Sequence, residues 1–220
     1  MPPILIDRHN KRLIYPDNSG DFGEIDELGV ILDNDQKEYI LLREKVSIEL
    51  SRLYVKDIKN NIVVANYVMT FNLSAPILFS PNLPQIESAY VDNEYRSLGI
   101  SVAIYLKIIE IYGGVISDTQ QTLGGMNLWA IGLSNSENIM LYVMHCHNNT
   151  LSHKYFSNGE LMLYECDKKS LIINSAHIWS RPSSIDFNVD LAFLENLNIP
   201  EGDFGERVVL LAISKLIEST

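Results

Sequence analysis

The segment Tyr95–Ser101, with the sequence YRSLGIS, carries the residue types and spacing best suited to chemistry. It lies between a strand-like stretch, 85–91, and an apolar stretch, 101–113, that predicts a helix. Backbone N–H groups at a helix start, together with the helix dipole, suit an anionic group. Arg96 adds a positive charge, and Gly99 allows close approach of the backbone. The spacing is typical of a phosphate-binding loop, although a plain glycine turn has the same pattern.

The longer stretch YVDNEYRSLGISVAIYLKIIE, residues 90–110, resembles motif A of the GNAT acyltransferase superfamily, whose members bind acyl-coenzyme A. In that family a splayed strand ends in valine, as at Val91, and a glycine-containing turn leads into a helix. Ser97 and Ser101 stand where the family has flanking glycines. The resemblance implies acetyl-CoA or another acyl-CoA as cofactor, with Val91 near the thioester carbonyl. It places the pyrophosphate on the backbone of Arg96, Ser97, Leu98, Gly99, Ile100 and Ser101.

The stretch TLGGMNLW, residues 122–129, resembles the second half of the family pattern. Thr122 stands where an asparagine often contacts coenzyme A, so the resemblance adds Thr122 to the cofactor site. Trp129 stands where a tyrosine often protonates the leaving thiolate, and an indole cannot serve as that acid. The wider stretch SDTQQTLGGMNLW is also similar to GNAT-like proteins from phage genomes. These departures leave open whether the chain is a catalyst or a binding protein.

Candidates for acid–base chemistry come from two predicted strands. Strand alternation puts the following residues on one face: Gln85, Glu87, Ala89 and Val91. Glu87 is the carboxylate of that face, so we expect it to take the amine proton, although a solvent-facing strand glutamate has the same pattern. Tyr90 falls on the opposite face. Tyr142, in the strand predicted over 138–147, is the candidate acid if it points into the cleft, and otherwise it packs in the sheet.

Histidines near the end of this strand raise the question of a metal site. His145 and His147 share a strand face, with His153 nearby, but no third and fourth ligand follows at a recognisable spacing. We therefore expect no metal. The cysteines, Cys146 and Cys166, have no catalytic context.

Other notable side chains have simpler structural interpretations. Asp118, at the end of the predicted strand 115–118, suits a helix cap better than a catalytic role. The helical apolar positions Tyr105, Leu106, Met126 and Trp129 are predicted to lie in the core.

The element pattern predicts an α+β fold with a GNAT-like mixed, mostly antiparallel central sheet flanked by helices. Expected strands cover 38–45, 46–57, 61–73, 85–91, 115–118 and 138–147, with helices over 101–113 and 119–133. Residues 58–61 are the expected hairpin turn between the second and third strands.

We expect an acyl-CoA-binding core over residues 1–150 and a C-terminal extension over 151–220. The core includes residues 17–36, which hold seven acidic residues and no Lys or Arg and are predicted to form a solvated loop. The extension is predicted to add strands at 159–165 and 169–179 and an amphipathic helix over 203–219, packed on the core.

Composition narrows the functional classes. The chain has 220 residues, 46% of them hydrophobic, and a formal net charge of −11, so a packed core is expected and nucleic-acid binding is disfavoured. With two cysteines and neither a signal-like nor a membrane-spanning apolar stretch, we expect a cytoplasmic protein, in the host cytoplasm if phage-encoded, without membrane partners. A monomer or a homodimer fits equally well.

The first functional hypothesis is an acyl-CoA-dependent N-acyltransferase that acetylates a primary amine of a small molecule or a protein. The alternative is a catalytically degenerate GNAT-like protein of phage type that binds or inhibits a partner. A third hypothesis, a Mom-type nucleobase-modifying enzyme, requires basic residues to cluster despite the acidic composition.

Overall fold

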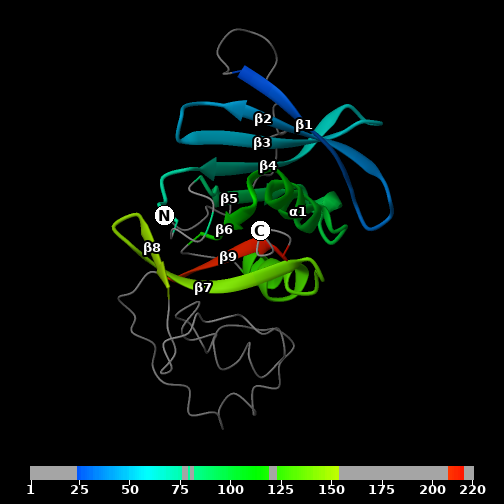
Figure 1. The fold of residues 1–220 in the computed structure, drawn as a ribbon. Helices are drawn as coiled ribbons and strands as arrows, with labels where there is room; N and C mark the ends of the chain where they lie inside the picture. Colours follow the sequence, from blue (N-terminus) through cyan, green and yellow to red (C-terminus); the bar gives the residue numbers. More distant parts are fainter. Residues whose placement is uncertain (1–23, 76–78, 80–81, 119–122, 154–207, 216–220) are drawn as a thin grey trace.

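The computed structural model describes residues 24–75, 79, 82–118, 123–153 and 208–215. Their nine strands form one mixed sheet in the order β1-β2-β3-β4-β5-β6-β9-β7-β8 (Figure 1). Neighbouring strands are antiparallel except β5 and β6, which are parallel. The predicted α+β class with a mostly antiparallel sheet is therefore confirmed.

An antiparallel meander forms the first half of the sheet. Its strands are β1 (Glu24–Leu32), β2 (Glu38–Lys45), β3 (Leu50–Asp57) and β4 (Ile62–Thr70). The predicted turn at 58–61 joins β3 to β4, and it ends at Asn61 with φ 53°, a conformation that asparagine tolerates. The hairpin prediction is thus confirmed.

The centre of the molecule is a strand–helix–strand unit. It consists of β5 (Gln85–Val91), α1 (Ile100–Tyr112) and β6 (Gly114–Ile116), which match the predicted elements. Helix α1 ends at Gly113, with φ 82° and an N–H bond to the carbonyl of Ile109 at 2.8 Å. The parallel strands β5 and β6 share one register pair, Gln85 with Ile116, because β6 ends at Ile116 while β5 begins at Gln85.

The chain continues from β6 into a helical segment and the last strands of the sheet. Helix α2 (Leu123–Asn127) runs directly into the π-helical segment η2 (Leu128–Leu133), and then come β7 (Ile139–His147) and β8 (Thr150–His153). The predicted helix 119–133 is confirmed from residue 123 onward. A Cβ atom on Gly132 would lie 2.8 Å from a methyl carbon of Val102, so the missing side chain lets η2 approach α1 closely.

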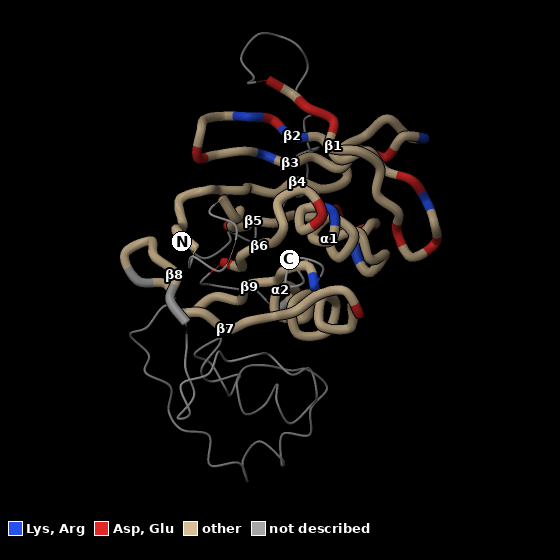
Figure 2. Tube along the Cα trace, in the orientation of Figure 1, with Lys and Arg blue, Asp and Glu red and all other residues tan. Residues whose placement is uncertain are grey.

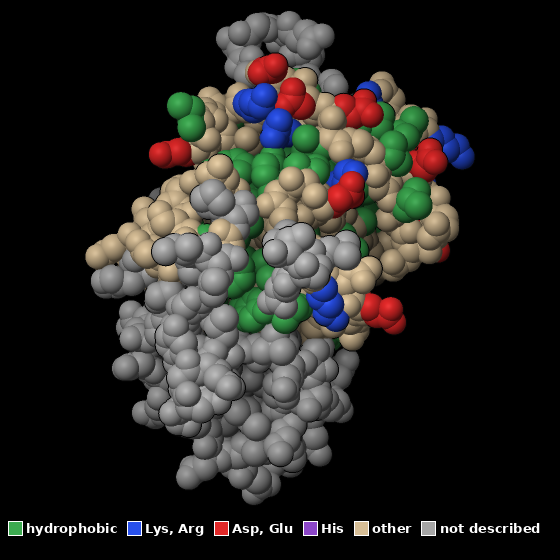
Figure 3. Space-filling model, viewed as in Figure 1, with side chains coloured by type: hydrophobic (Ala, Val, Ile, Leu, Met, Phe, Trp, Pro, Cys, Tyr) green, Lys and Arg blue, Asp and Glu red, His purple; other side chains and the backbone are tan. Residues whose placement is uncertain are grey.

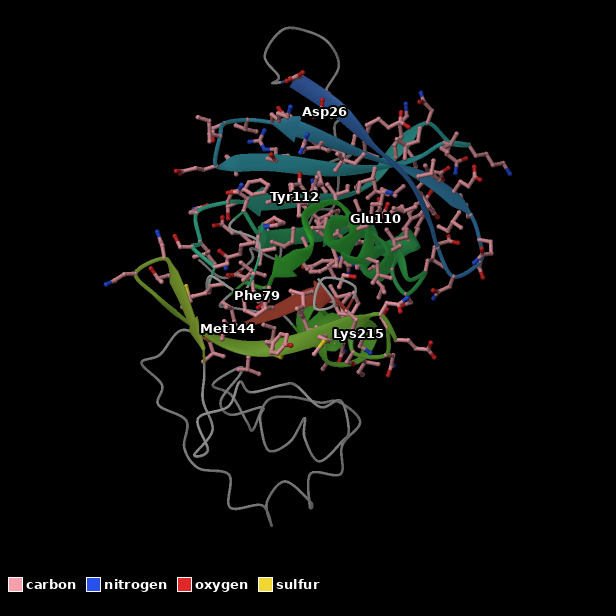
Figure 4. The ribbon with its side chains drawn as sticks, in the orientation of Figure 1. Asp26, Phe79, Glu110, Tyr112, Met144 and Lys215 are labelled. Carbon is pink, nitrogen blue, oxygen red and sulfur yellow. The ribbon has the colours of Figure 1, made fainter. Side chains whose placement is uncertain are left out.

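The predicted loop over residues 17–36 is wrong from residue 24 to residue 32, which form β1. Asp26 of β1 pairs with Arg43 and Lys45 of β2, at 2.5 and 3.2 Å. Arg43 also donates to the hydroxyl of Tyr112 at 2.5 Å. By binding both Asp26 and Tyr112, which are labelled in Figure 4, Arg43 connects β1 to the end of α1. An acidic segment becomes a good edge strand when its neighbour supplies the cations.

The predicted helix over residues 203–219 is wrong over Val208–Ser214, which form β9. This strand lies between β6 and β7, where both of its faces are buried. One face contributes Val208, Leu210 and Ala212 to the core beneath α1, and the other contributes Val209, Leu211 and Ile213 to the opposite core. A continuous apolar run fits either a buried strand or a helix, so periodicity alone could not separate them.

The main core lies between the sheet and the helices, and it holds the predicted core residues. Tyr105, Met126 and Trp129 are buried, and Leu106 packs against the same cluster while partly exposed. The rings of Tyr105 and Trp129 meet edge to face at 5.6 Å. None of the helices in the described part of the chain is long and apolar enough to cross a membrane. The strands predicted at 159–165 and 169–179 lie outside the described residues.

Candidate functional site

The loop between β5 and α1 has the conformation that the sequence predicts, a connection from strand to helix. A short 3-10 turn, Asn93–Tyr95, follows β5, and α1 begins at Ile100. Ser97 and Gly99 both adopt positive φ, at 66° and 79°. The backbone therefore turns sharply twice before the helix begins.

Gly99 is required at the start of α1 by its conformation and by its neighbour. A Cβ atom at this position would lie 2.2 Å from Oδ1 of Asn34, in the turn between β1 and β2. Asn34 also donates its backbone N–H to the carbonyl of Leu98 at 2.8 Å. Gly99 is the N-cap of α1 and offers no side-chain cap, so backbone N–H groups of the first turn are left for another acceptor.

The side chains of the loop are divided between solvent and core. Arg96 is exposed and donates from Nε to the carbonyl of Val91 at 3.0 Å. Ser97 is exposed, Leu98 packs partly against the main core, and Ile100 is buried. The guanidinium thus folds back toward β5, and Ile100 has only its backbone to offer a ligand.

Ser101 faces the core through its hydroxyl. Its Oγ lies 2.9 Å from the hydroxyl of Tyr67, a residue of β4 that is 1% exposed. Burial raises the pKa of Tyr67 well above its ordinary value, so this phenol stays protonated. The predicted backbone role of Ser101 remains compatible with this contact.

The sequence did not reveal a buried carboxylate, Asp57, that holds the loop. Oδ2 of Asp57 accepts bonds from Lys37 Nζ at 2.6 Å, Asn60 Nδ2 at 2.7 Å and the hydroxyl of Tyr95 at 3.1 Å. Burial by itself would raise the pKa of Asp57, but hydrogen bonds from Lys37, Asn60 and Tyr95 outweigh it and lower the pKa to about 2. The sequence shows only that Asp57 precedes the hairpin turn at 58–61, and an aspartate at that position predicts a turn residue rather than a contact with a distant loop.

Glu87 does not share a face with Ala89 and Val91, contrary to the prediction. The pairing of β4 with β5 shifts between Ile86 and Ser88, which makes Glu87 the extra residue of a β-bulge. Glu87 is exposed, and one of its oxygens accepts from Thr70 Oγ1 at 3.1 Å. The bulge re-aims this carboxylate, because it breaks the alternation on which the prediction rested.

Tyr142, the candidate acid, and Trp129, which stands at the family's tyrosine position, are both buried. Tyr142 is 5% exposed, packs against Phe79 at 5.8 Å between ring centroids, and points its hydroxyl at the sulfur of Met140. Trp129 is 1% exposed in the main core. Tyr142 therefore packs against the sheet, and its contacts with Phe79 and Met140 are separate from the contact of Glu87 with Thr70.

Two further predictions concern the second half of the chain. Thr122, predicted to contact the cofactor, lies outside the described residues. His145 and His147 lie on β7, paired with Ser152 and Thr150 of β8. Within the described ranges, no group of three or more His, Cys, Asp or Glu side chains is placed to hold a metal ion.

No protein-family model, curated protein or solved structure matched the chain when its sequence and fold were compared with them. The functional argument therefore depends on the loop, on the adjacent edge of β5 and on the charges of both.

Proposed function

We propose that the chain is a GNAT-type N-acyltransferase that uses acetyl-CoA or a related acyl-CoA and acylates a primary amine. The observation that carries this proposal is the connection from β5 through a glycine-containing loop to α1, next to an edge of β5 that β6 pairs only at Gln85. The resemblance of residues 90–110 to motif A implies such a sequence of strand, turn and helix.

The edge of β5 that faces β6 supplies a place for an extended ligand. Beyond the pair formed by Gln85 and Ile116, β5 continues to Val91 while the chain after β6 leaves the parallel ladder. The amide of Gln85 bridges the junction by donating to the carbonyl of Ser117 at 2.9 Å. Backbone polar groups on this edge of β5 can then pair with a ligand that lies along the strand, as in strand addition.

The loop suits the pyrophosphate of coenzyme A for three reasons. The N-terminus of α1 carries a partial positive charge and lacks a side-chain cap. The positive φ of Gly99 turns the backbone sharply into α1, so the N–H groups of the first helical turn follow the loop directly, with the Asn34 side chain packed beside Gly99. Arg96 is exposed next to it, and its guanidinium can meet an anion when it leaves the carbonyl of Val91 and the ring of Tyr90.

The proposed chemistry assigns one proton-handling role to this chain. When bound, acyl-CoA would supply the thioester from which the acyl group leaves. Glu87 is an exposed carboxylate on the bulge of β5, so it can accept the proton that an acceptor ammonium must lose before the amine is nucleophilic. With Tyr142 and Trp129 both buried, water is the proton source for the leaving thiolate.

Calorimetric titration of the full chain with acetyl-CoA tests binding. Mass spectrometry of primary amines incubated with the chain and acetyl-CoA tests acyl transfer. Saturable binding and an acylated product are the expected results. A chain that binds neither acetyl-CoA nor free coenzyme A would overturn the proposal.

A second candidate function is a GNAT-like binding protein without catalysis. Burial of both Trp129 and Tyr142 favours it, because neither side chain reaches a leaving thiolate in this arrangement. Binding of acetyl-CoA with no acylation of any amine offered would support this candidate over the enzyme.

The charge distribution does not favour nucleic acid as a substrate. Among the residues that the structure describes, Figures 2 and 3 show Lys and Arg interspersed with Asp and Glu over the meander rather than gathered along a groove. Several of these cations are paired with carboxylates: Lys37, Arg43, Lys45, Arg52 and Lys107. Cations that are already neutralised contribute little attraction for phosphate groups.

A further inference from the structure

Asp57 joins three segments that are separate in the chain. It receives Lys37 from the turn between β1 and β2, Asn60 from the turn between β3 and β4, and Tyr95 from the loop before α1. Its other oxygen accepts the backbone N–H groups of Lys59 and Asn60, at 3.0 and 3.2 Å. A carboxylate that is fully buried and bonded to five donors resists displacement, because each lost bond leaves part of its charge unsatisfied.

The loop is tied to the meander on both sides of its exposed residues Arg96 and Ser97. The hydroxyl of Tyr95 bonds to Asp57, and the carbonyl of Leu98 accepts the N–H of Asn34. The exposed residues Arg96 and Ser97 lie between these two anchors. The backbone of Arg96 and Ser97, which would contact a phosphate, is therefore held on one side by the Tyr95 contact and on the other by the Leu98 contact.

The turn that carries Asn34 is itself held by a second buried aspartate. Oδ1 of Asp33 accepts the N–H groups of Asp35 and Lys37, each at 2.9 Å, and Oδ2 accepts the hydroxyl of Tyr39 at 2.9 Å. The ring of Tyr39 also meets the ring of Tyr95 edge to face at 6.3 Å. The two anchors thus belong to one continuous set of contacts.

A buried carboxylate behind an anion-binding loop would oppose the anion if its charge were uncompensated. Lys37 compensates it, because its ammonium lies 2.6 Å from Asp57 and 5.3 Å from the centre of the Tyr95 ring. The pair is close to neutral at the distance of the loop. The contact between Asp57 and Tyr95 therefore positions the loop while Lys37 balances the charge of Asp57.

We propose that Asp57 and Tyr95 are positioning residues that preset the loop between β5 and α1 for an anionic ligand, an inference that rests on the proposed acyl-CoA site. Loop N–H groups that are already held in place lose little conformational freedom when an anion binds. The bond between Asp57 and Tyr95 therefore raises the affinity of the loop for the anion, although neither residue touches it. The meander β1–β4 is then part of the binding device as well as part of the scaffold.

Tyr95→Phe tests this inference, since it removes the hydroxyl and keeps the ring. Tyr54→Phe is the matched control, because the hydroxyl of Tyr54 also bonds to a buried carboxylate, that of Glu44, at 2.7 Å. Tyr54 lies in β3 and Glu44 in β2, so this bond lies outside the loop. Two measurements are made on the full-length variants and on the unsubstituted chain: calorimetric titration with acetyl-CoA, and amide hydrogen exchange over residues 92–100.

We expect Tyr95→Phe to weaken acetyl-CoA binding about tenfold, the ratio that one hydrogen bond to a charged group supplies. Exchange over residues 92–100 should also become about tenfold faster, while Tyr54→Phe leaves both quantities near those of the unsubstituted chain. If exchange in the loop responds equally to the two variants, the positioning inference is overturned, whether or not ligand binds. If exchange responds as expected but the unsubstituted chain binds no acetyl-CoA, the proposed function fails and the assigned ligand fails with it.

Discussion

Asn34 lies against Gly99, so the first hairpin of the sheet touches the start of the central helix. The backbone N–H of Asn34 bonds to Leu98, and its side chain occupies the space that a side chain at position 99 would need. This contact makes the glycine a structural requirement as well as a feature of an anion-binding loop.

Gly99→Ala should therefore destabilise the chain more than Gly113→Ala. Both glycines have left-handed conformations, with φ 79° and 82°, so both substitutions carry a backbone cost of about 1–2 kcal/mol. Only a Cβ at Gly99 also meets Asn34. Urea unfolding at neutral pH measures the difference, and Asn34→Gly in the Gly99→Ala background should recover part of the loss. Equal costs for the two alanine variants would contradict this prediction.

Arg96→Glu should abolish measurable acetyl-CoA binding without unfolding the chain. The substitution places a negative charge beside the proposed pyrophosphate, and at ~4 Å in a partly screened site the repulsion is about 4 kcal/mol. Calorimetric titration measures the affinity, with circular dichroism to verify folding. Lys59→Glu makes the same charge change at an exposed residue of the turn between β3 and β4 and should leave binding intact. Unchanged affinity in Arg96→Glu would show that the loop is not the phosphate site.

The bond between Tyr67 and Ser101 should appear as a coupled pair in unfolding experiments. Ser101→Ala leaves the buried phenol of Tyr67 without this partner, which costs about 1–3 kcal/mol. Adding Tyr67→Phe removes the orphaned hydroxyl and should restore much of the loss. A double-mutant cycle from urea unfolding gives the coupling free energy, and strictly additive costs would mean that the two hydroxyls do not interact.

Asp57 should make the stability of the fold depend on acid pH. Its pKa is about 2 in the folded chain and 3.8 in the reference state, so the unfolded chain binds its proton first as the pH falls. The contribution of about 2 kcal/mol is complete above pH ~4 and is lost progressively toward pH ~2.

Comparing the unfolding free energy of the unsubstituted chain and Asp57→Asn at several pH values measures this contribution. The difference between the two proteins should shrink as the pH falls from about 4 to about 2. A difference that stays constant over this range would show that the carboxylate is not held in its charged form.

Removing residues 208–220 should prevent cooperative folding rather than merely lower the melting temperature. The segment Val208–Ser214 pairs with both β6 and β7, and its loss exposes two apolar edges and both cores. Circular dichroism and size-exclusion chromatography should show an aggregated or unfolded chain. A soluble chain with an intact unfolding transition would mean that β9 is dispensable.

The local pattern determined the elements around the site. The alternation in QIESAYV predicted β5 with both of its bounds, and the apolar run after Ser101 predicted α1, which begins one residue earlier, at Ile100. The order of strand, loop and helix followed from these two, and so did the core positions of Tyr105 and Trp129. Such features depend on neighbours within a few residues, which the sequence shows directly.

Contacts between distant segments decided the rest. The apolar run at 208–214 became a strand because the gap between β6 and β7 buries both of its faces, and the acidic run at 24–32 became a strand because β2 supplies Arg43 and Lys45. Glu87 does not share the predicted face with Ala89 and Val91, because the pairing of β5 with β4 contains a bulge at Glu87. The bond between Asp57 and Tyr95 forms between segments that are 38 residues apart in the chain. Propensity and periodicity describe one segment at a time, whereas register, burial on both faces and charge pairing exist only once segments meet.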